Sequence, residues 1–408
     1  MNDASATQAT RPSCLWLARE LPFPPITGDR IYSGCLAAAL AGADVDVEYL
    51  GFEVKDSRDL PTGPGPKWVG VAGNKRSYWL AVFSRLPLVA AAHDTAAMRR
   101  ALDQMLERDW DAIVLDHYST AWALERVKRN LRRRGARTVL IHIAQNHEEA
   151  LAYALYQSFH GSLLRRAVLY MNYLKIRHWE RRLTREVDVV GAITEEDREA
   201  FLRRRAVSDM LVLTPGYSGD PALTRTIDSS IGRRVVVIGS FRWVVKEQNL
   251  RQLLIAADHR FAENGISLDV VGDVAPELIN EFGGQLKATI FHGLVADFRP
   301  FFERARIALV PEVIGGGFKL KFLDYIFRRV PVATLSDASA GVPGSVRRHF
   351  LQSDSLPALV EQVIANIDDL ALLDRLQTDA YRAAEHLFRW QDRGALLADA
   401  IARHRVAA

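Results

Sequence analysis

Cysteine is scarce in this sequence. Only Cys14 and Cys35 occur among 408 residues, and neither has other metal-ligand side chains close by in the sequence. A disulfide framework, a zinc ribbon and an iron–sulfur site each need more cysteines at characteristic spacings. All three are therefore excluded.

Long apolar runs are also missing. A membrane-spanning helix needs ~20 consecutive apolar residues, and the best candidate, residues 78–92, is short and contains Arg85. Residues 1–13 are polar and lack the apolar core of a signal peptide. We expect a cytoplasmic protein that associates, at most peripherally, with the inner face of a membrane.

The chain carries little excess charge. Its 53 Lys and Arg against 49 Asp and Glu give a net charge of +4, whereas a dedicated nucleic-acid-binding protein is normally far more basic. We therefore expect no nucleic-acid partner.

The excess positive charge is nevertheless concentrated in one region, because residues 121–190 hold fourteen Lys and Arg against six Asp and Glu. Within this region, residues 163–182 mix Leu, Tyr and Trp with Arg. Such a segment can lie on an anionic membrane surface and collect a lipid-linked acceptor. The alternative is a helix that faces the core and has a basic outer face, and the pattern favours this alternative.

The length predicts two domains. We expect a first domain at 1–216, a linker at 217–233, a second domain at 234–385 and a helix at 386–408 that returns to the first domain. The region 55–75 is rich in Pro and Gly and is predicted to be an irregular loop.

Both halves alternate short apolar runs with helical segments, which is typical of α/β folds with parallel sheets. Open sheets of this class bind ligands at the carboxyl ends of their strands. Strands are predicted at residues 14–18, 45–50, 112–115, 138–143, 187–192, 210–213, 235–238, 268–271, 289–291, 307–310 and 330–333.

The strongest chemical signal lies in residues 311–325, where three consecutive glycines follow a strand. A helix predicted to start at about Phe318 would direct its first N–H groups toward an anion. Lys319 and Lys321 add positive charge, and Asp324 can accept hydrogen bonds from ribose hydroxyls. The motif predicts a site for a sugar-nucleotide diphosphate; the alternative is a glycine-rich turn with two solvated lysines.

A second signal, residues 239–246, follows the first strand of the second half. It ends with Lys246 near a predicted helix start, where the ammonium group can meet the same diphosphate.

Taken in order, the motifs resemble those of the glycosyltransferase family 4 group of retaining GT-B enzymes. The resemblance extends over roughly 300 residues, and it implies two Rossmann-like doubly wound domains that face a central cleft. The motifs that carry it are residues 239–246, 270–273, 291–295, 305–311 and 315–325 in the second half, and 27–32, 145–148, 192–194 and 215–216 in the first.

The resemblance implies four groups of site residues. Donor diphosphate binding falls on Ser240, Lys246, Gly316, Gly317, Phe318, Lys319 and Lys321. Ribose and base binding falls on Gly272, Leu294, Val295 and Asp324. The acceptor side comprises Gly28, Asp29, Arg30, Asn146 and Glu148, and the catalytic position next to the reacting sugar falls on Asp116 and His117. An Asp-His pair at a strand end is also a common structural pair.

The sequence departs from the family pattern at two positions. The glutamate that contacts the donor sugar in the family falls on Gly316, and Glu312 is a possible substitute. The arginine of the family's phosphate clamp falls on Ser240, which leaves Lys246 and Arg242 as the local cations.

The resemblance implies a glycosyltransferase that moves a sugar from a nucleotide-diphosphate sugar to a glycan, a lipid-linked molecule or another acceptor in polysaccharide or glycoconjugate biosynthesis. It implies retention of configuration, no cofactor and no metal. Two alternatives remain open. One is a sugar-nucleotide epimerase that uses Asp116, His117, His147 or Glu148 as acid and base, and the other is a non-catalytic nucleotide-sugar-binding protein.

Overall fold

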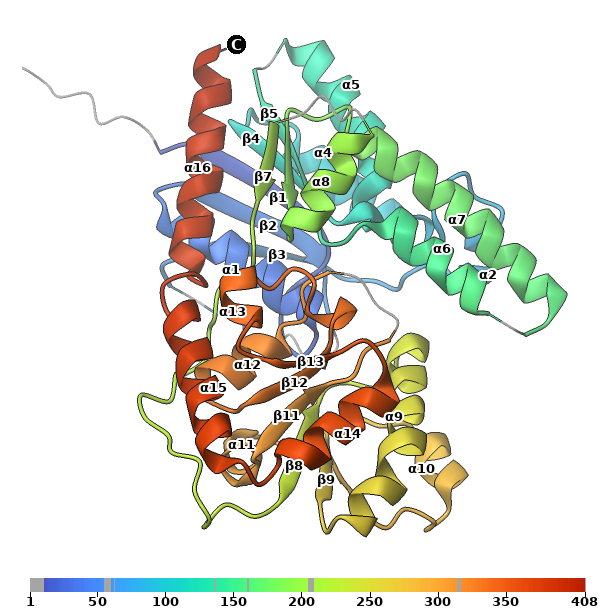
Figure 1. The fold of residues 1–408 in the computed structure, drawn as a ribbon. Coiled ribbons are helices and arrows are strands. Elements are labelled where there is room, and N and C mark those ends of the chain that lie inside the picture. The colour runs from blue at the N-terminus through green and yellow to red at the C-terminus, as the bar shows by residue number, and fades with distance from the viewer. Residues whose placement is uncertain are drawn as a thin grey trace, which may run out of the picture. The chain divides into compact units, whose positions relative to one another are not determined.

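The structure is a computed structural model that describes residues 11–54, 60–61, 63–135, 137–159, 161–204, 209–313 and 317–407. The chain divides into two units (Figure 1). Unit 1 takes its residues from Met1–Ile193, Asp197–Leu213 and Trp390–Ala408, and unit 2 takes them from Thr194–Glu196 and Thr214–Arg389.

Unit 1 is built on a seven-stranded parallel sheet with the order β3-β2-β1-β4-β5-β6-β7. The central strands β4 and β5 are buried along their whole length, as their apolar sequences predict. The strands are β1 (Ser13–Glu20), β2 (Asp46–Phe52), β3 (Lys67–Val71), β4 (Ala112–Asp116), β5 (Val139–Ala144), β6 (Val189–Ala192) and β7 (Asp209–Val212).

The prediction of an irregular loop over residues 55–75 is wrong for its second half. Residues 67–71 form the edge strand β3, which pairs with β2 from Lys67 opposite Glu48 to Val71 opposite Phe52. The ring of Trp68 packs edge-on against Phe23 and lies 5.1 Å from that of Tyr49. These contacts are distant in sequence, so local composition does not reveal the strand.

Helices cover the sheet of unit 1, and the last of them, α16, packs closely on α1. A Cβ atom built on Gly394 of α16 would lie 2.1 Å from the carbonyl oxygen of Ala39 in α1, so glycine permits the approach of the two backbones. The helices are α1 (Gly28–Gly42), α2 (Tyr78–Ala81), α3 (Leu88–His93), α4 (Ala96–Met105), η1 (Tyr118–Ala123), α5 (Leu124–Arg134), α6 (Glu148–Ser158), α7 (Leu163–Leu183), α8 (Glu195–Arg203) and α16 (Trp390–Ala407).

Helices α6 and α7 form an antiparallel hairpin that extends away from the sheet of unit 1 (Figure 1). The rings of Tyr153 and Tyr173 are 5.2 Å apart across this hairpin. The buried residues of α7 are Ile176, Glu180 and Leu183, all in its second half. The prediction of a core-facing helix is therefore wrong for the first half of α7, because no core reaches that part of the hairpin.

Unit 2 is built on a six-stranded parallel sheet with the order β10-β9-β8-β11-β12-β13. Both sheets thus have the predicted parallel α/β architecture. The strands are β8 (Arg234–Ile238), β9 (Ser267–Val271), β10 (Thr289–Gly293), β11 (Ile307–Val310), β12 (Val332–Leu335) and β13 (Leu351–Ser353).

Helices of unit 2 pack on this sheet around a core that includes Phe322 and Tyr325 of α12. The helices are α9 (Val244–Glu263), α10 (Pro276–Phe282), α11 (Arg299–Arg304), α12 (Lys321–Phe327), η2 (Asp337–Ser339), α13 (Gly344–Arg347), α14 (Leu356–Asn366) and α15 (Leu370–Ala384). Over the described ranges of both units, the helices lack the combination of length and hydropathy that a bilayer-spanning segment needs.

Candidate functional site

Unit 1 has a polar pocket at the carboxyl ends of its central strands. Arg19 and Glu20 end β1 and Asp116 ends β4, so their side chains converge at one edge of the parallel sheet. The pocket brings together four of the predicted residues. It is lined by Ala18, Arg19, Glu20, Asp29, Arg30, Ser33, Tyr49, Asp116, His117 and Gln145.

Asp116 is buried and organises the floor of this pocket. Its carboxylate accepts hydrogen bonds from Trp16 Nε1 and from Gln145 Nε2, each at 2.9 Å. Burial raises the pKa of Asp116, and the hydrogen bonds oppose that shift. Because both oxygens are engaged within the protein, the geometry suits a carboxylate that positions Gln145 and Trp16.

His117 follows Asp116 in a strained backbone conformation, with φ 65° and ψ 154°. This region is adopted almost only by glycine and costs on the order of 1–3 kcal/mol elsewhere. The backbone N–H of Ser119 donates to His117 Nδ1 at 3.2 Å. The proton of a neutral His117 ring therefore lies on Nε2, which is 3.3 Å from Glu148 Oε1.

Glu148 is the first residue of α6, and its buried side chain is held from two sides. Asn146 Nδ2 donates to Glu148 Oε1 at 2.9 Å, and His117 approaches the same oxygen. Burial raises the pKa of Glu148, but the contacts with His117 and Asn146 outweigh burial and lower the pKa overall. Glu148 is therefore a carboxylate at neutral pH, positioned to accept a hydrogen bond from His117 Nε2.

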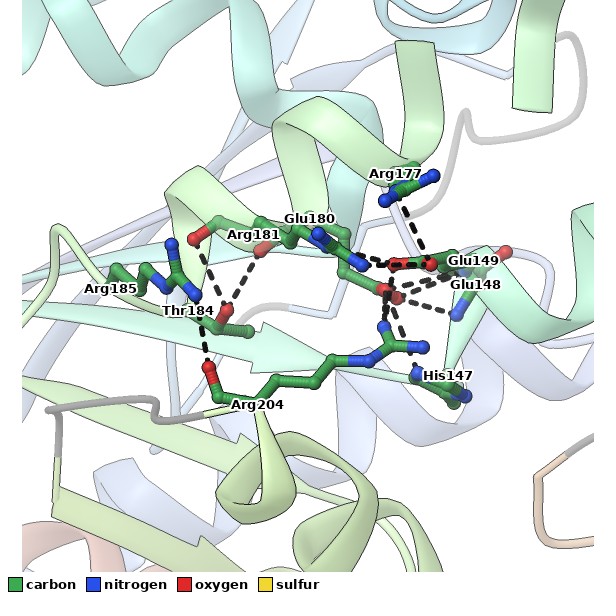
Figure 2. Close-up of polar contacts among 9 residues, drawn as sticks. All are labelled: His147, Glu148, Glu149, Arg177, Glu180, Arg181, Thr184, Arg185 and Arg204. Carbon is green, nitrogen blue, oxygen red and sulfur yellow. Dashed lines mark hydrogen bonds and ion pairs between the residues drawn. The ribbon is translucent and has the colours of Figure 1, made fainter. Parts of the chain in front are cut away.

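The start of α6 is itself fixed by Glu180 from α7, as Figure 2 shows. Glu180 Oε1 accepts the backbone N–H of Glu148 at 2.6 Å, and both its oxygens lie 3.3 Å from the nitrogen of Glu149. A carboxylate at a helix N-terminus satisfies N–H groups that have no partner within the helix. Burial and repulsion by Glu148 nevertheless raise the pKa of Glu180 to about 8.

Arginines surround the carboxylate of Glu149, the second residue of α6 (Figure 2). Glu149 accepts from Arg204 at 2.6 Å and from Arg181 at 3.2 Å, and Arg177 lies 3.7 Å away. Arg204 also lies 3.5 Å from Glu180. These ion pairs join the start of α6 to the last turns of α7, next to Glu148.

The opposite side of the pocket carries further ion pairs. Arg19 pairs with Asp29 in the first turn of α1. Glu20 accepts from Arg30 at 2.5 Å and also pairs with Lys75. Burial raises the pKa of Glu20, but the hydrogen bonds from Lys75 and Arg30 lower it overall to about 2.

Sequence reasoning missed Arg19, Glu20 and Gln145 as pocket residues, and it missed Lys75, which pairs with the pocket residue Glu20. Arg19 and Glu20 had a readable signal, because two polar residues end an apolar strand just as Asp116 and His117 do. Lys75 had no such signal, since its contact with Glu20 joins residues far apart in the sequence. Gly28 lies at the first position of α1 and is not among the residues that line the pocket.

In unit 2, Lys321 is held at the carboxyl end of β8. Its Nζ donates to Glu312 Oε1 at 2.6 Å, and a Cβ atom built on Gly239 would lie 3.7 Å from Nζ. Burial raises the pKa of Glu312, but the positive charge of Lys321 lowers it overall. The structure thus pairs Glu312 with a predicted diphosphate-binding lysine.

The glycine-rich loop precedes a shorter helix than predicted. α12 begins at Lys321, not near Phe318, and has seven residues, so Phe318 and Lys319 belong to the loop. Gly317 has φ 65°, and the ring of Phe318 lies 5.7 Å from that of Phe388. Gly316 lies outside the described residues.

The strands β8 and β9 end in glycines that approach each other closely. Gly272 has φ 131°, and a Cβ atom built on it would lie 1.8 Å from the carbonyl oxygen of Gly239. Only glycine fits at this position. Ser240 follows directly, and Lys246 lies in the first turn of α9. Arg242 pairs with Asp273 at 2.8 Å.

Two of the predicted base residues follow another strand of unit 2, and the predicted ribose residue lies in a helix. Leu294 and Val295 follow β10, and the Leu294 side chain is exposed. Asp324 lies in α12, where burial raises its pKa to about 7. Within the described residues, no group of three or more His, Cys, Asp or Glu side chains is arranged to hold a metal ion.

Comparison with known proteins finds a family that matches part of the chain. Residues 232–369, which lie within unit 2, match the family described as Glycosyl transferases group 1. This segment contains Ser240, Lys246, Lys321 and Asp324. No curated protein matches the sequence.

Solved structures share the fold of almost the whole chain. Sucrose-phosphate synthase from Thermosynechococcus elongatus has a TM-score of 0.71 and 17% identity, over 98% of this chain and 100% of that one. WaaG, a glycosyltransferase involved in lipopolysaccharide biosynthesis, has a TM-score of 0.62 and 15% identity over 95% and 99%. HepE from Anabaena, in complex with UDP and glucose, has a TM-score of 0.60 and 14% identity over 96% and 100%.

The two parallel sheets and the matched segment define a GT-B glycosyltransferase. The matched segment, residues 232–369, is similar to the glycosyl transferases group 1 family, the family that the sequence motifs resemble. The matched segment and the shared fold indicate a glycosyltransferase that takes a sugar from a nucleotide-sugar donor. The predicted resemblance to this family and the predicted enzyme class are confirmed.

Proposed function

We propose that unit 2 binds the donor diphosphate around Lys321. The observation that carries this proposal is the ammonium group of Lys321, held by Glu312 at the end of β8 beside Gly239. A fixed positive charge in this position stabilises a diphosphate that gains negative charge as it leaves the sugar. The proposed diphosphate group is Ser240, Lys246, Gly316, Gly317, Phe318, Lys319 and Lys321.

The ribose and base of the donor lie on the adjoining strand ends. Asp324, once ionised, accepts hydrogen bonds from the ribose hydroxyls. The backbone at Gly272, Leu294 and Val295 meets the base and sugar.

Unit 1 supplies the groups for the acceptor and the reacting sugar. His117, whose Nε2 proton is oriented by Glu148, contacts the reacting sugar. Asp116 precedes it in the chain and is itself held by Gln145 and Trp16. The acceptor meets Gly28, Asp29, Arg30, Asn146 and Glu148. Two ion pairs, Arg19 with Asp29 and Arg30 with Glu20, hold these side chains in place.

The transfer proceeds with retention of configuration. The acceptor oxygen forms a bond to the anomeric carbon on the face from which the diphosphate leaves, and the bond between that carbon and the phosphate oxygen breaks. The acceptor proton passes to the departing phosphate oxygen. Lysines supply the positive charge that the departing group needs, so the reaction requires no metal ion.

The acceptor is a glycan or a lipid-linked molecule of polysaccharide or glycoconjugate biosynthesis. Support comes from WaaG, a structural relative involved in lipopolysaccharide biosynthesis. The pocket of unit 1 supports it too, because alternating carboxylates and arginines are suited to hydroxyl-rich ligands.

Thermal unfolding with UDP, GDP, ADP and dTDP tests the donor site. A nucleotide at about 100 times its dissociation constant adds roughly 2.7 kcal/mol to the unfolding free energy. We expect one nucleotide to raise Tm equally with and without EDTA. Lys246→Ala should reduce that shift, whereas Lys287→Ala, which removes an exposed lysine of the same unit, should leave it unchanged. If no nucleotide raises Tm, or if EDTA abolishes the effect, the proposed site is wrong.

A further inference from the structure

Two long stretches of unit 1 contain no acidic residue. Neither residues 60–93 nor residues 150–179 include an Asp or a Glu, although together they carry eight Lys and Arg. A surface with charge of one sign attracts partners of the opposite sign. The eight residues are Lys67, Lys75, Arg76, Arg85, Arg165, Arg166, Lys175 and Arg177.

The structure brings the two stretches side by side. Lys175 of α7 donates to the carbonyl oxygen of Val82 at 2.7 Å, and Trp179 Nε1 donates to that of Arg85 at 3.1 Å. In Figure 1, α2 lies beside the α6–α7 hairpin, in agreement with these contacts. The segment that contains α2 therefore runs along α7.

Large apolar side chains are exposed on the same elements. In and just after α2, the exposed fractions are 80% for Trp79, 71% for Leu80 and 89% for Phe83. At the start of α7, they are 83% for Leu163 and 73% for Leu164. Exposed apolar residues are common singly, but two groups of them on neighbouring elements mark an interaction site.

Basic residues flank each of these apolar groups. Arg76 precedes α2, and Arg165 and Arg166 follow Leu164 directly. We name the α2/α7 surface by these eight residues: Arg76, Trp79, Leu80, Phe83, Leu163, Leu164, Arg165 and Arg166.

We propose that the α2/α7 surface docks this enzyme on an anionic phospholipid bilayer. Trp79, Leu80 and Phe83 enter the headgroup region, and the flanking Arg side chains contact lipid phosphates. Exposed Trp and Phe beside Lys and Arg are typical of segments that lie in a membrane interface. The inference goes beyond the proposed function and does not depend on the donor site of unit 2.

Charge selects the bilayer over a second copy of the chain. A symmetric dimer through this surface would place the same positive charges against each other, which is unfavourable. A polyanion without an apolar phase would leave Trp79, Leu80 and Phe83 exposed to water.

Sedimentation with vesicles tests the proposal. We expect the wild-type enzyme to bind vesicles that contain about 30 mol% phosphatidylglycerol at least about tenfold more tightly than pure phosphatidylcholine. Raising the salt from about 50 mM to about 500 mM should weaken this binding by about tenfold. A wild-type enzyme that remains in the supernatant at low salt overturns the proposal.

Matched variants separate this surface from the rest of the molecule. Trp79→Ser with Phe83→Ser should weaken vesicle binding about tenfold, and Arg165→Glu with Arg166→Glu should do the same. The apolar control is Leu223→Ser with Ile255→Ser, which changes exposed residues of unit 2. The charge control is Arg132→Glu with Arg133→Glu, which changes exposed arginines of α5. Equal losses in a test pair and its control overturn the proposal.

Two further measurements keep the outcome interpretable. Vesicles with brominated acyl chains should quench the wild-type tryptophan fluorescence, and Trp79→Phe should abolish most of the quenching while it preserves binding. Light scattering should give the same mass for wild type and for Trp79→Ser with Phe83→Ser; a wild-type dimer that this variant dissociates overturns the proposal. Nucleotide-induced Tm shifts should persist in all folded variants, so failure of the donor site remains a separate result.

Discussion

The carboxylate of Glu180 accepts the backbone N–H of Glu148 at 2.6 Å. A residue in α7 thereby fixes the start of α6. Because Glu148 faces His117 across 3.3 Å, the α6–α7 hairpin also determines where the imidazole of His117 can donate its proton.

Glu180→Gln should change the pH dependence of stability. Burial and Glu148 raise the pKa of Glu180 to about 8, so the folded state binds more protons than the unfolded state above about pH 4.5. The contribution of Glu180 to the unfolding free energy is present at low pH and is lost as the pH rises to about 8. The unfolding free energy of wild type minus that of Glu180→Gln should therefore fall by about 1 kcal/mol or more between about pH 5 and pH 8.

Denaturant unfolding at several pH values measures this difference. Glu199→Gln, at an exposed position of α8, is the control and should show no such slope. A flat difference for Glu180→Gln would mean that Glu180 keeps an ordinary pKa in the folded protein.

Substitutions of His117 should separate strain from activity. His117→Ala and His117→Gly both remove the imidazole, and each should lower kcat by about tenfold or more. Because φ is 65° at this position, the glycine variant should unfold with about 1 kcal/mol more free energy than the alanine variant. Steady-state kinetics and denaturant unfolding measure the two effects. Equal stability of the two variants would argue against backbone strain, and unchanged kcat would remove His117 from the reacting centre.

The pair of Lys321 and Glu312 should behave differently as single and double variants. Lys321→Met leaves Glu312 buried without its counter-charge and should cost about 3 kcal/mol. The double variant Lys321→Met with Glu312→Gln should recover most of that stability, because no uncompensated charge remains. Neither variant should show the nucleotide-induced rise in Tm. If the double variant keeps that rise, Lys321 does not bind the diphosphate.

Nucleotide affinity should depend on pH through Asp324. Burial raises the pKa of this carboxyl to about 7, and only the ionised form accepts hydrogen bonds at both oxygens from ribose hydroxyls. Affinity should therefore rise between about pH 6 and pH 8, as measured by calorimetry in buffers matched for ionic strength. Asp324→Asn should bind more weakly at pH 8 and lose this dependence; the same slope in the variant would assign the titration to another group.

Gly272→Ala should destabilise unit 2 strongly. The new Cβ would lie 1.8 Å from the carbonyl oxygen of Gly239, at φ 131°. We expect a loss of about 3 kcal/mol or more. Gly284→Ala is the control, because Gly284 also has a positive φ but no atom within 4 Å of the new Cβ, so it should cost only about 1 kcal/mol. Similar losses in both would mean that the backbones of β8 and β9 separate easily.

The order of strands and helices could be predicted because each central strand is an uninterrupted apolar run. β4 and β5 are buried along their length, and such strands are visible in a sequence. β3 was missed, because its five residues are stabilised by pairing with β2 and by contacts of Trp68 with Phe23 and Tyr49. The start of α12 was placed three residues early, since glycines and lysines give no capping signal there.

Part of the pocket of unit 1 could be predicted from the sequence for a similar reason. Asp116 and His117 are polar residues that end an apolar strand, and the topology of a parallel sheet brings such residues together. The role of Glu180 could not be predicted, because this residue lies within a basic helix and contacts the start of α6 only when that helix packs on α6. The exposure of α2 and of the first half of α7 likewise depends on where the core ends, which periodicity does not show.

Unit 1 is completed by α16, whose Gly394 packs against Ala39 of α1. About 180 residues of unit 2 separate this helix from the rest of unit 1 along the chain. At roughly 5–20 residues per second, a ribosome needs about 10–35 s to synthesise that interval. Throughout this time α1 of the nascent chain lacks the helix that covers it, so unit 1 has a longer exposure to chaperones and to aggregation than unit 2, although its synthesis begins first.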